Sequence, residues 1–124
     1  MSEGYHCFLN GDDNYAGVGV VIAPWFRPYI QDIIQLSDRI IRVEVRTAAA
    51  PSYFFGVCAP TMKDEHADLR TSFWSTLQAQ LATIPPRAMV GVFGDLNVRL
   101  RAKRSFEEVI GPYVFGQGPT YIEC

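Results

Sequence analysis

The chain has 124 residues, of which 48% are hydrophobic and 19% are charged. This composition excludes wholesale disorder, because it supplies enough apolar surface for one packed domain. The formal net charge of −2 excludes attachment to nucleic acid through overall charge alone. No apolar run approaches the roughly 18 residues of a membrane span. The N-terminal residues form neither a basic nor an apolar segment, so we expect no signal peptide and no membrane contact.

The cysteines indicate a reducing compartment. Cys7, Cys58 and Cys124 are widely spaced, and an odd number of cysteines is not a disulfide framework. No Cys-x-x-Cys or Cys/His spacing typical of structural zinc occurs. We therefore expect free thiols and a nuclear or cytoplasmic location. Cys58 lies in an apolar run and is interpreted as a small buried side chain, with a catalytic thiol as the alternative.

The first elements are predicted to form a β-hairpin. Residues 5–9 and 16–22 are strand-like, and the segment 10–14 between them is dense in turn-forming residues. The following segment, 24–36, contains two prolines. We expect it to be irregular, with one helical turn.

Two further strands are predicted in the middle of the chain. Apolar and polar residues alternate over 39–45, which is typical of a half-buried strand. Residues 53–59 are almost continuously apolar, as in a strand buried on both faces. The loop 47–52 between them is short, so the two strands are expected to pair in antiparallel fashion.

Residues 64–83 predict an amphipathic helix, capped by Asp64. Residues 89–93 then predict a second buried strand, and 106–110 a short helix. Strand, helix and strand make one crossover, which indicates a mixed α/β or α+β fold with a helix on one face of the sheet. The predicted core side chains of the long helix are Phe73, Trp74, Leu77, Leu81 and Ile84, and those predicted to face solvent are Arg70, Gln78 and Gln80.

Polar residues follow the two buried strands that flank the helix. Gly94-Asp95-Leu96-Asn97 delivers a carboxylate and a carboxamide at one strand end, and Thr61 follows the other. Ligands and catalytic groups gather at the carboxyl ends of strands in α/β sheets. A right-handed crossover would make these two strands parallel and would place their ends on the same edge of the sheet. Asp95 could orient a water or hold a divalent cation, and Asn97 suits a phosphate oxygen beside a metal. The alternative is that these side chains, like Thr61, only form turns.

These motifs resemble the endonuclease/exonuclease/phosphatase family. Residues 56–61 (Gly-Val-Cys-Ala-Pro-Thr) match a family strand that ends in Tyr-Ala-Pro-Asn/Thr, and 92–98 (Val-Phe-Gly-Asp-Leu-Asn-Val) match a later strand that ends in Gly-Asp-Phe-Asn. More narrowly, the passages 16–22, 36–40 and 109–113 are similar to the retrotransposon-type endonucleases and to the craniofacial-development-protein-2-like proteins derived from them.

The resemblance implies a two-sheet α/β sandwich that hydrolyses phosphodiesters of nucleic acid with Mg²⁺. It implies that Asp95 orients or activates the attacking water. Asn97 would contact the scissile phosphate and the metal site, and Thr61 would lie near the phosphate. DNA or another nucleic acid is the implied partner.

The departures from the family predict a partial domain over 1–124. The family tyrosine is Cys58 here, and the family's Asn and metal-binding Glu would precede the region matching Tyr5. The family's C-terminal Ser-Asp-His segment has no counterpart. Because the main Glu ligand is missing, we expect the chain alone to be catalytically inert. Half a sandwich would also expose Tyr53–Phe55 and Val90–Phe93, which predicts self-association or poor solubility.

A binding module without chemistry is the alternative function. Arg99, Arg101 and Arg104 lie in a basic stretch that could contact phosphates, although a solvated loop has the same composition. A gene product without a selected role is a third interpretation, and the sequence does not separate it from the second.

Overall fold

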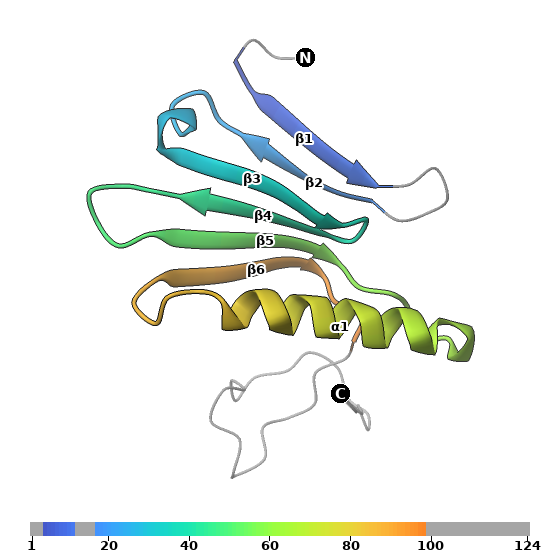
Figure 1. Cartoon of the computed structure of the whole chain (residues 1–124). Helices are drawn as coiled ribbons and strands as arrows, with labels where there is room; N and C mark the ends of the chain where they lie inside the picture. Colours follow the sequence, from blue (N-terminus) through green and yellow to red (C-terminus); the bar gives the residue numbers. More distant parts are fainter. Residues whose placement is uncertain (1–3, 12–16, 99–124) are drawn as a thin grey trace, which may run out of the picture.

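A computed structural model describes residues 4–11 and 17–98. They form two β-sheets and one long α-helix (Figure 1), which is the mixed α+β class expected from the sequence. One sheet has the strand order β1-β2 and the other the order β3-β4-β5-β6. The predicted helix 106–110 lies outside the described residues.

The small sheet is the predicted hairpin. Strands β1 (His6–Gly11) and β2 (Gly17–Ile22) pair in antiparallel register, with His6 opposite Ile22. Strand β2 packs closely on β5 of the larger sheet, since a Cβ added at Gly56 would lie 3.3 Å from a methyl carbon of Val18. The hairpin therefore covers one face of the larger sheet.

The segment expected to be irregular contains a strand. A 3₁₀ turn at Arg27–Tyr29 fits the predicted helical turn, but β3 (Ile30–Ser37) follows it and pairs with β4. The pairing register shifts between Ile30 and Asp32 and again between Gln35 and Ser37. Each shift breaks the two-residue alternation by which a strand is found in a sequence.

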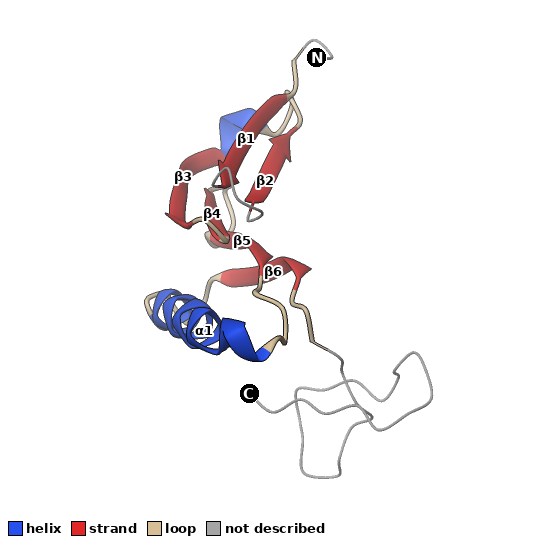
Figure 2. Ribbon diagram, turned by 90° about the vertical axis from the view of Figure 1, so that its right-hand side faces the viewer, coloured by secondary structure: helices blue, strands red, loops and turns tan. Residues whose placement is uncertain are grey.

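Strands β4 (Ile40–Val45) and β5 (Ser52–Cys58) are antiparallel neighbours, as predicted. The predicted alternation in β4 is confirmed, because its four apolar side chains are buried whereas Arg42 and Glu44 are only partly covered. Ile40 and Ile41 point to opposite faces, and both are fully buried. The hairpin covers one face of β4 and the helix covers the other. Figure 2 shows the hairpin and α1 on opposite sides of the larger sheet.

The predicted helix is shorter than expected. A 3₁₀ turn (Asp64–His66) precedes α1 (Ala67–Ala82), and no side chain caps either start, so the predicted Asp64 cap is absent. Phe73 and Leu77 are buried against β4 and β5 as predicted, and Trp74 and Ile84 pack at the margin of this core. Leu81 is instead exposed.

The crossover returns into β6 (Met89–Asp95), which is parallel to β5 as predicted. The prediction that this strand is buried is wrong, since Met89 and Phe93 are 58% and 62% exposed. The reason is its position: β6 lies at the edge of the sheet that the described strands form, and α1 packs over β4 and β5 instead. The expected exposure of Val90–Phe93 is thus observed, whereas Phe55 is fully buried, contrary to expectation.

Candidate functional site

The parallel pairing of β5 and β6 places their carboxyl ends side by side. Cys58 lies opposite Asp95 in the register, and the Ala59 amide donates a hydrogen bond of 2.8 Å to the Asp95 carbonyl. The segments 59–61 and 95–97, widely separated in sequence, therefore meet at one edge of the sheet. We call this the strand-end edge.

The backbone of the second segment is tightly constrained. Gly94 has a φ of 140°, and a Cβ there would lie 1.9 Å from the Val57 carbonyl oxygen. Only glycine fits such a position. Asn97 has a φ of 50°, in the left-handed region that asparagine tolerates better than most residues. The Gly-Asp-Leu-Asn sequence thus allows the chain to turn sharply while it stays against β5.

Asp95 and Asn97 form a turn, which the sequence analysis gave as the alternative to a catalytic role. The Asn97 amide donates to Asp95 Oδ1 at 2.8 Å, and Asn97 Nδ2 donates to the Ala59 carbonyl at 2.6 Å. Within the described residues, Asp95 Oδ2 and Asn97 Oδ1 have no hydrogen-bond partner. Asp95 is exposed and Asn97 is half-buried. The same side chains therefore build the turn and leave one oxygen each for a ligand.

Thr61 is held by His66, the last residue of the 3₁₀ turn that precedes α1. Thr61 Oγ1 and His66 Nδ1 lie 2.7 Å apart in a hydrogen bond. His66 Nε2 lies 3.6 Å from a carboxylate oxygen of Glu65. The His66 side chain is only 28% exposed, so it is packed in place beside Thr61.

Arg70 fixes the loop that carries Thr61. Its Nη1 donates to the Thr61 carbonyl at 3.0 Å and to the Lys63 carbonyl at 2.6 Å. The prediction that Arg70 faces solvent is therefore wrong. The four-residue spacing between His66 and Arg70 could have indicated their shared role, because such a spacing puts two side chains on one side of a helix.

Arg39 is a second cation at this edge that the sequence did not indicate. Its Nη1 donates to the Cys58 carbonyl at 3.1 Å, and its own carbonyl accepts the Cys58 amide at 3.0 Å. Arg39 precedes β4, and the antiparallel pairing of β4 with β5 puts it beside the end of β5. Arg39 and Arg70 thus place two guanidinium groups on the carbonyls around the end of β5.

The described residues do not fit a preformed magnesium site. Among them, no group of three or more His, Cys, Asp or Glu side chains is placed to hold a metal. Asp95 supplies one carboxylate and Asn97 one amide oxygen, whereas Mg²⁺ prefers a near-octahedral shell of oxygens. Cys58 is a half-buried free thiol beside them.

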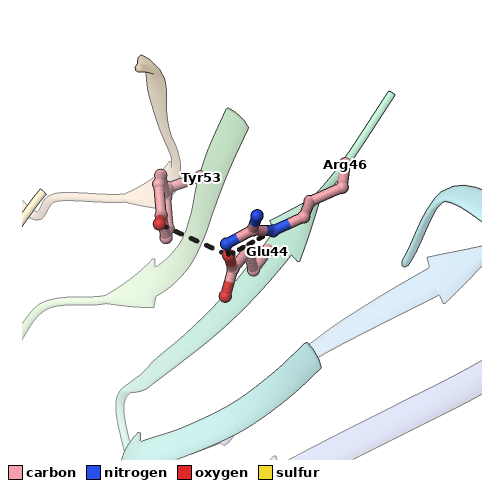
Figure 3. Close-up of polar contacts among 3 residues, drawn as sticks. All are labelled: Glu44, Arg46 and Tyr53. Atoms are coloured by element: carbon pink, nitrogen blue, oxygen red, sulfur yellow. Dashed lines mark hydrogen bonds and ion pairs between the residues drawn. The ribbon is translucent and has the colours of Figure 1, made fainter. Parts of the chain in front are cut away.

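A second polar cluster lies at the opposite end of β5 (Figure 3). Glu44 Oε1 accepts hydrogen bonds from Arg46 Nη2 at 3.1 Å and from the Tyr53 hydroxyl at 3.4 Å. Arg42 lies over the Tyr53 ring, 5.9 Å from its centre, and donates to Gln80 Oε1 at 3.0 Å. Gln80 is therefore partly buried, and the prediction that it faces solvent is wrong. These contacts join β4, β5 and α1, so we interpret the cluster as structural.

The remaining predictions concern the basic stretch, membrane spans and the family resemblance. Arg99, Arg101 and Arg104 lie outside the described residues. In the part of the chain that the structure covers, no helix is long and apolar enough to cross a membrane. Comparison with models of known protein families, with curated proteins and with solved structures finds no match.

Proposed function

We propose that this chain is a domain of the endonuclease/exonuclease/phosphatase type that binds a phosphodiester of nucleic acid at the strand-end edge. One observation carries the proposal: the parallel register of β5 and β6 brings the Ala-Pro-Thr and Gly-Asp-Leu-Asn motifs together. The side-chain amide of Asn97 donates a hydrogen bond to the Ala59 carbonyl across this junction. These are the two motifs on which the resemblance rests. Their juxtaposition is what a shared phosphate site needs.

The chemistry of the edge suits a phosphodiester. The guanidinium groups of Arg39 and Arg70 each use one nitrogen for the carbonyls of the β5 end. Their other nitrogens remain to donate to phosphate oxygens, the ligands that guanidinium groups bind well. Asn97 Oδ1 and Asp95 Oδ2 would then accept hydrogen bonds from a bound water.

The same residues do not complete a hydrolytic site. Phosphodiester hydrolysis of this kind needs a metal held by carboxylates, an oriented nucleophile and stabilisation of the transition-state charge. The described residues provide a single carboxylate at the edge, and no group of three or more metal-ligating side chains occurs among them. We therefore propose binding without turnover, as in a non-catalytic module derived from a retrotransposon-type endonuclease.

Binding is tested by fluorescence anisotropy with a labelled DNA duplex and a labelled single strand over a salt series. We expect salt-dependent binding that the double variant Arg39→Gln/Arg70→Gln weakens about tenfold or more, because two charged hydrogen-bond donors are lost. Arg27→Gln is the matched control, since Arg27 contacts His6 in the hairpin instead. Equal affinity of the double variant and the control would overturn the proposal.

Turnover is tested separately with supercoiled plasmid and Mg²⁺. We expect no cleavage above the level of a buffer control. Cleavage that Asp95→Ala abolishes and Asp32→Ala leaves intact would show an active nuclease, contrary to the proposed loss of chemistry. Asp32 is a suitable control because it lies on β3, at the other edge of the described sheet, where its carboxylate accepts a hydrogen bond from the Ile33 amide.

A further inference from the structure

The Thr61 hydroxyl and the His66 imidazole share one hydrogen bond, and its direction sets what the hydroxyl offers to a ligand. Thr61 Oγ1 lies 2.7 Å from His66 Nδ1. A hydroxyl carries one proton and two acceptor lone pairs, so a threonine that donates to the ring has no proton left for a phosphate oxygen. Thr61 is exposed at the strand-end edge, so a ligand can reach this hydroxyl.

The neutral ring is expected to accept this hydrogen bond. A neutral imidazole has one N–H and one bare nitrogen, and the partner of one nitrogen decides which of them carries the proton. His66 Nε2 lies 3.6 Å from a carboxylate oxygen of Glu65, which favours the proton on Nε2. Nδ1 is then bare and accepts from Thr61. In this state the hydroxyl turns only lone pairs toward the edge, and these repel the oxygens of a phosphodiester.

Protonation of the ring reverses the bond. Both nitrogens of an imidazolium are donors, so Nδ1 then donates to Thr61 Oγ1. The hydroxyl proton is released from the ring and can point at a ligand. Uptake of one proton from solvent at His66 thus adds a positive charge beside the edge and turns a repelling hydroxyl into a donor.

We propose that His66 is a positioning residue that couples phosphodiester binding at the strand-end edge to the uptake of one proton. The coupling rests on the proposed function, because it acts at the same site, and it adds a dependence on pH. Histidine is the side chain that ordinarily changes charge between about pH 5 and pH 8. The affinity for a phosphodiester should therefore rise as the pH falls through this interval.

Charged groups of both signs bear on the ring. They come from the loop before it, its own turn, α1 and the neighbouring strands: Lys63, Asp64, Glu65, Arg70, Arg39 and Asp95. Glu65 stabilises the imidazolium through its position beside Nε2. Arg70 opposes it as a like charge, although its Nη1 is directed at two backbone carbonyls. A bound phosphodiester adds negative charge here and tips the balance toward the imidazolium.

Fluorescence anisotropy with a labelled single-stranded DNA, at constant salt over a pH series, tests the coupling. We expect the intact chain to bind about tenfold or more tightly at about pH 5.5 than at about pH 8, because a hydrogen bond to a charged group is gained. His66→Gln should bind weakly and equally at both values. His6→Gln is the matched control, since the other histidine of the chain lies on β1 and contacts Arg27. This control should keep the full pH dependence.

Two variants of Thr61 separate the hydroxyl from the charge of the ring. Thr61→Val keeps the approximate shape and removes the hydroxyl, so it should lose most of the pH dependence. Thr61→Ser keeps a hydroxyl and should restore it. Binding of the intact chain that does not vary with pH, or a pH dependence that survives in full in Thr61→Val, would overturn the coupling and leave the proposed binding intact. Absence of DNA binding at every pH would overturn the proposed function, and the coupling with it.

Imidazole ¹⁵N NMR of the chain without ligand tests the direction of the hydrogen bond independently. We expect His66 at about pH 8 to be the neutral tautomer with its proton on Nε2, and to become an imidazolium when a short single-stranded DNA is added at about pH 7. A neutral ring with its proton on Nδ1 would contradict the coupling, because the Thr61 hydroxyl would then be able to donate at any pH.

Discussion

Strands β5 and β6 are neighbours with similar apolar sequences, yet they lie in opposite environments. Phe55 and Val57 of β5 are almost fully buried in the core that α1 forms with β4 and β5. In contrast, all four large apolar residues of β6 are exposed. The difference arises from position in the sheet, since among the described strands β5 has a neighbour on each side and β6 has one. An apolar sequence therefore does not by itself predict that a strand is buried, because burial also depends on which elements the fold packs against it.

The largest expected effect compares the two strands directly. Phe55→Ala should lower the free energy of unfolding by about 3–5 kcal/mol, because it empties a fully buried site. Phe93→Ala should cost less than about 1 kcal/mol, since its ring is mostly in solvent. Urea unfolding followed by circular dichroism measures both. Equal losses would mean that the β6 face is covered in solution.

A smaller loss is expected at the junction of the two strands. Gly94→Ala should destabilise the fold by about 2 kcal/mol or more, because an L side chain at this φ collides with the Val57 carbonyl. Gly91→Ala is the control on the same strand, where an added Cβ would meet side-chain ring atoms of Phe93 and Phe54 and no backbone atom. A Gly94→Ala chain as stable as the control would show that the turn does not lie against β5.

The smallest effect is expected at the polar cluster of Glu44. Glu44→Gln should cost about 0.5–1 kcal/mol, because the neutral amide weakens the bonds from Arg46 and Tyr53 without leaving a cavity. The loss should shrink in high salt, since Arg46 is 60% exposed. A loss above about 3 kcal/mol would indicate that the cluster does more than join β4 to β5.

Sequence patterns predicted the elements that depend on neighbouring residues in the chain. The turn-rich segment between residues 9 and 16 indicated the hairpin, and helical spacing placed Phe73 and Leu77 in the core. The bulges in β3 concealed its alternation, so that strand was missed. The exposure of β6 was mispredicted in the strand assignment because burial depends on which strand lies at the edge, and no local pattern encodes that order.

The candidate site shows the same division. Asp95, Asn97 and Thr61 were placed at one edge from the sequence, because a parallel crossover brings two strand ends together, and the register agrees. Arg39 and Arg70 were missed as members of this edge. Arg39 reaches it through an antiparallel pairing, and Arg70 through the fold of the loop after β5. Such tertiary contacts have no periodic signature.

The central claim is that the strand-end edge receives a phosphodiester. Backbone amide NMR of the intact chain, titrated with a short DNA oligonucleotide at low salt, tests it most directly. The account predicts that the largest shifts fall on residues 39, 59–61, 66 and 94–97, and that they diminish in the Arg39→Gln/Arg70→Gln variant. Shifts confined to the hairpin, or no shifts at a concentration where anisotropy detects binding, would contradict it.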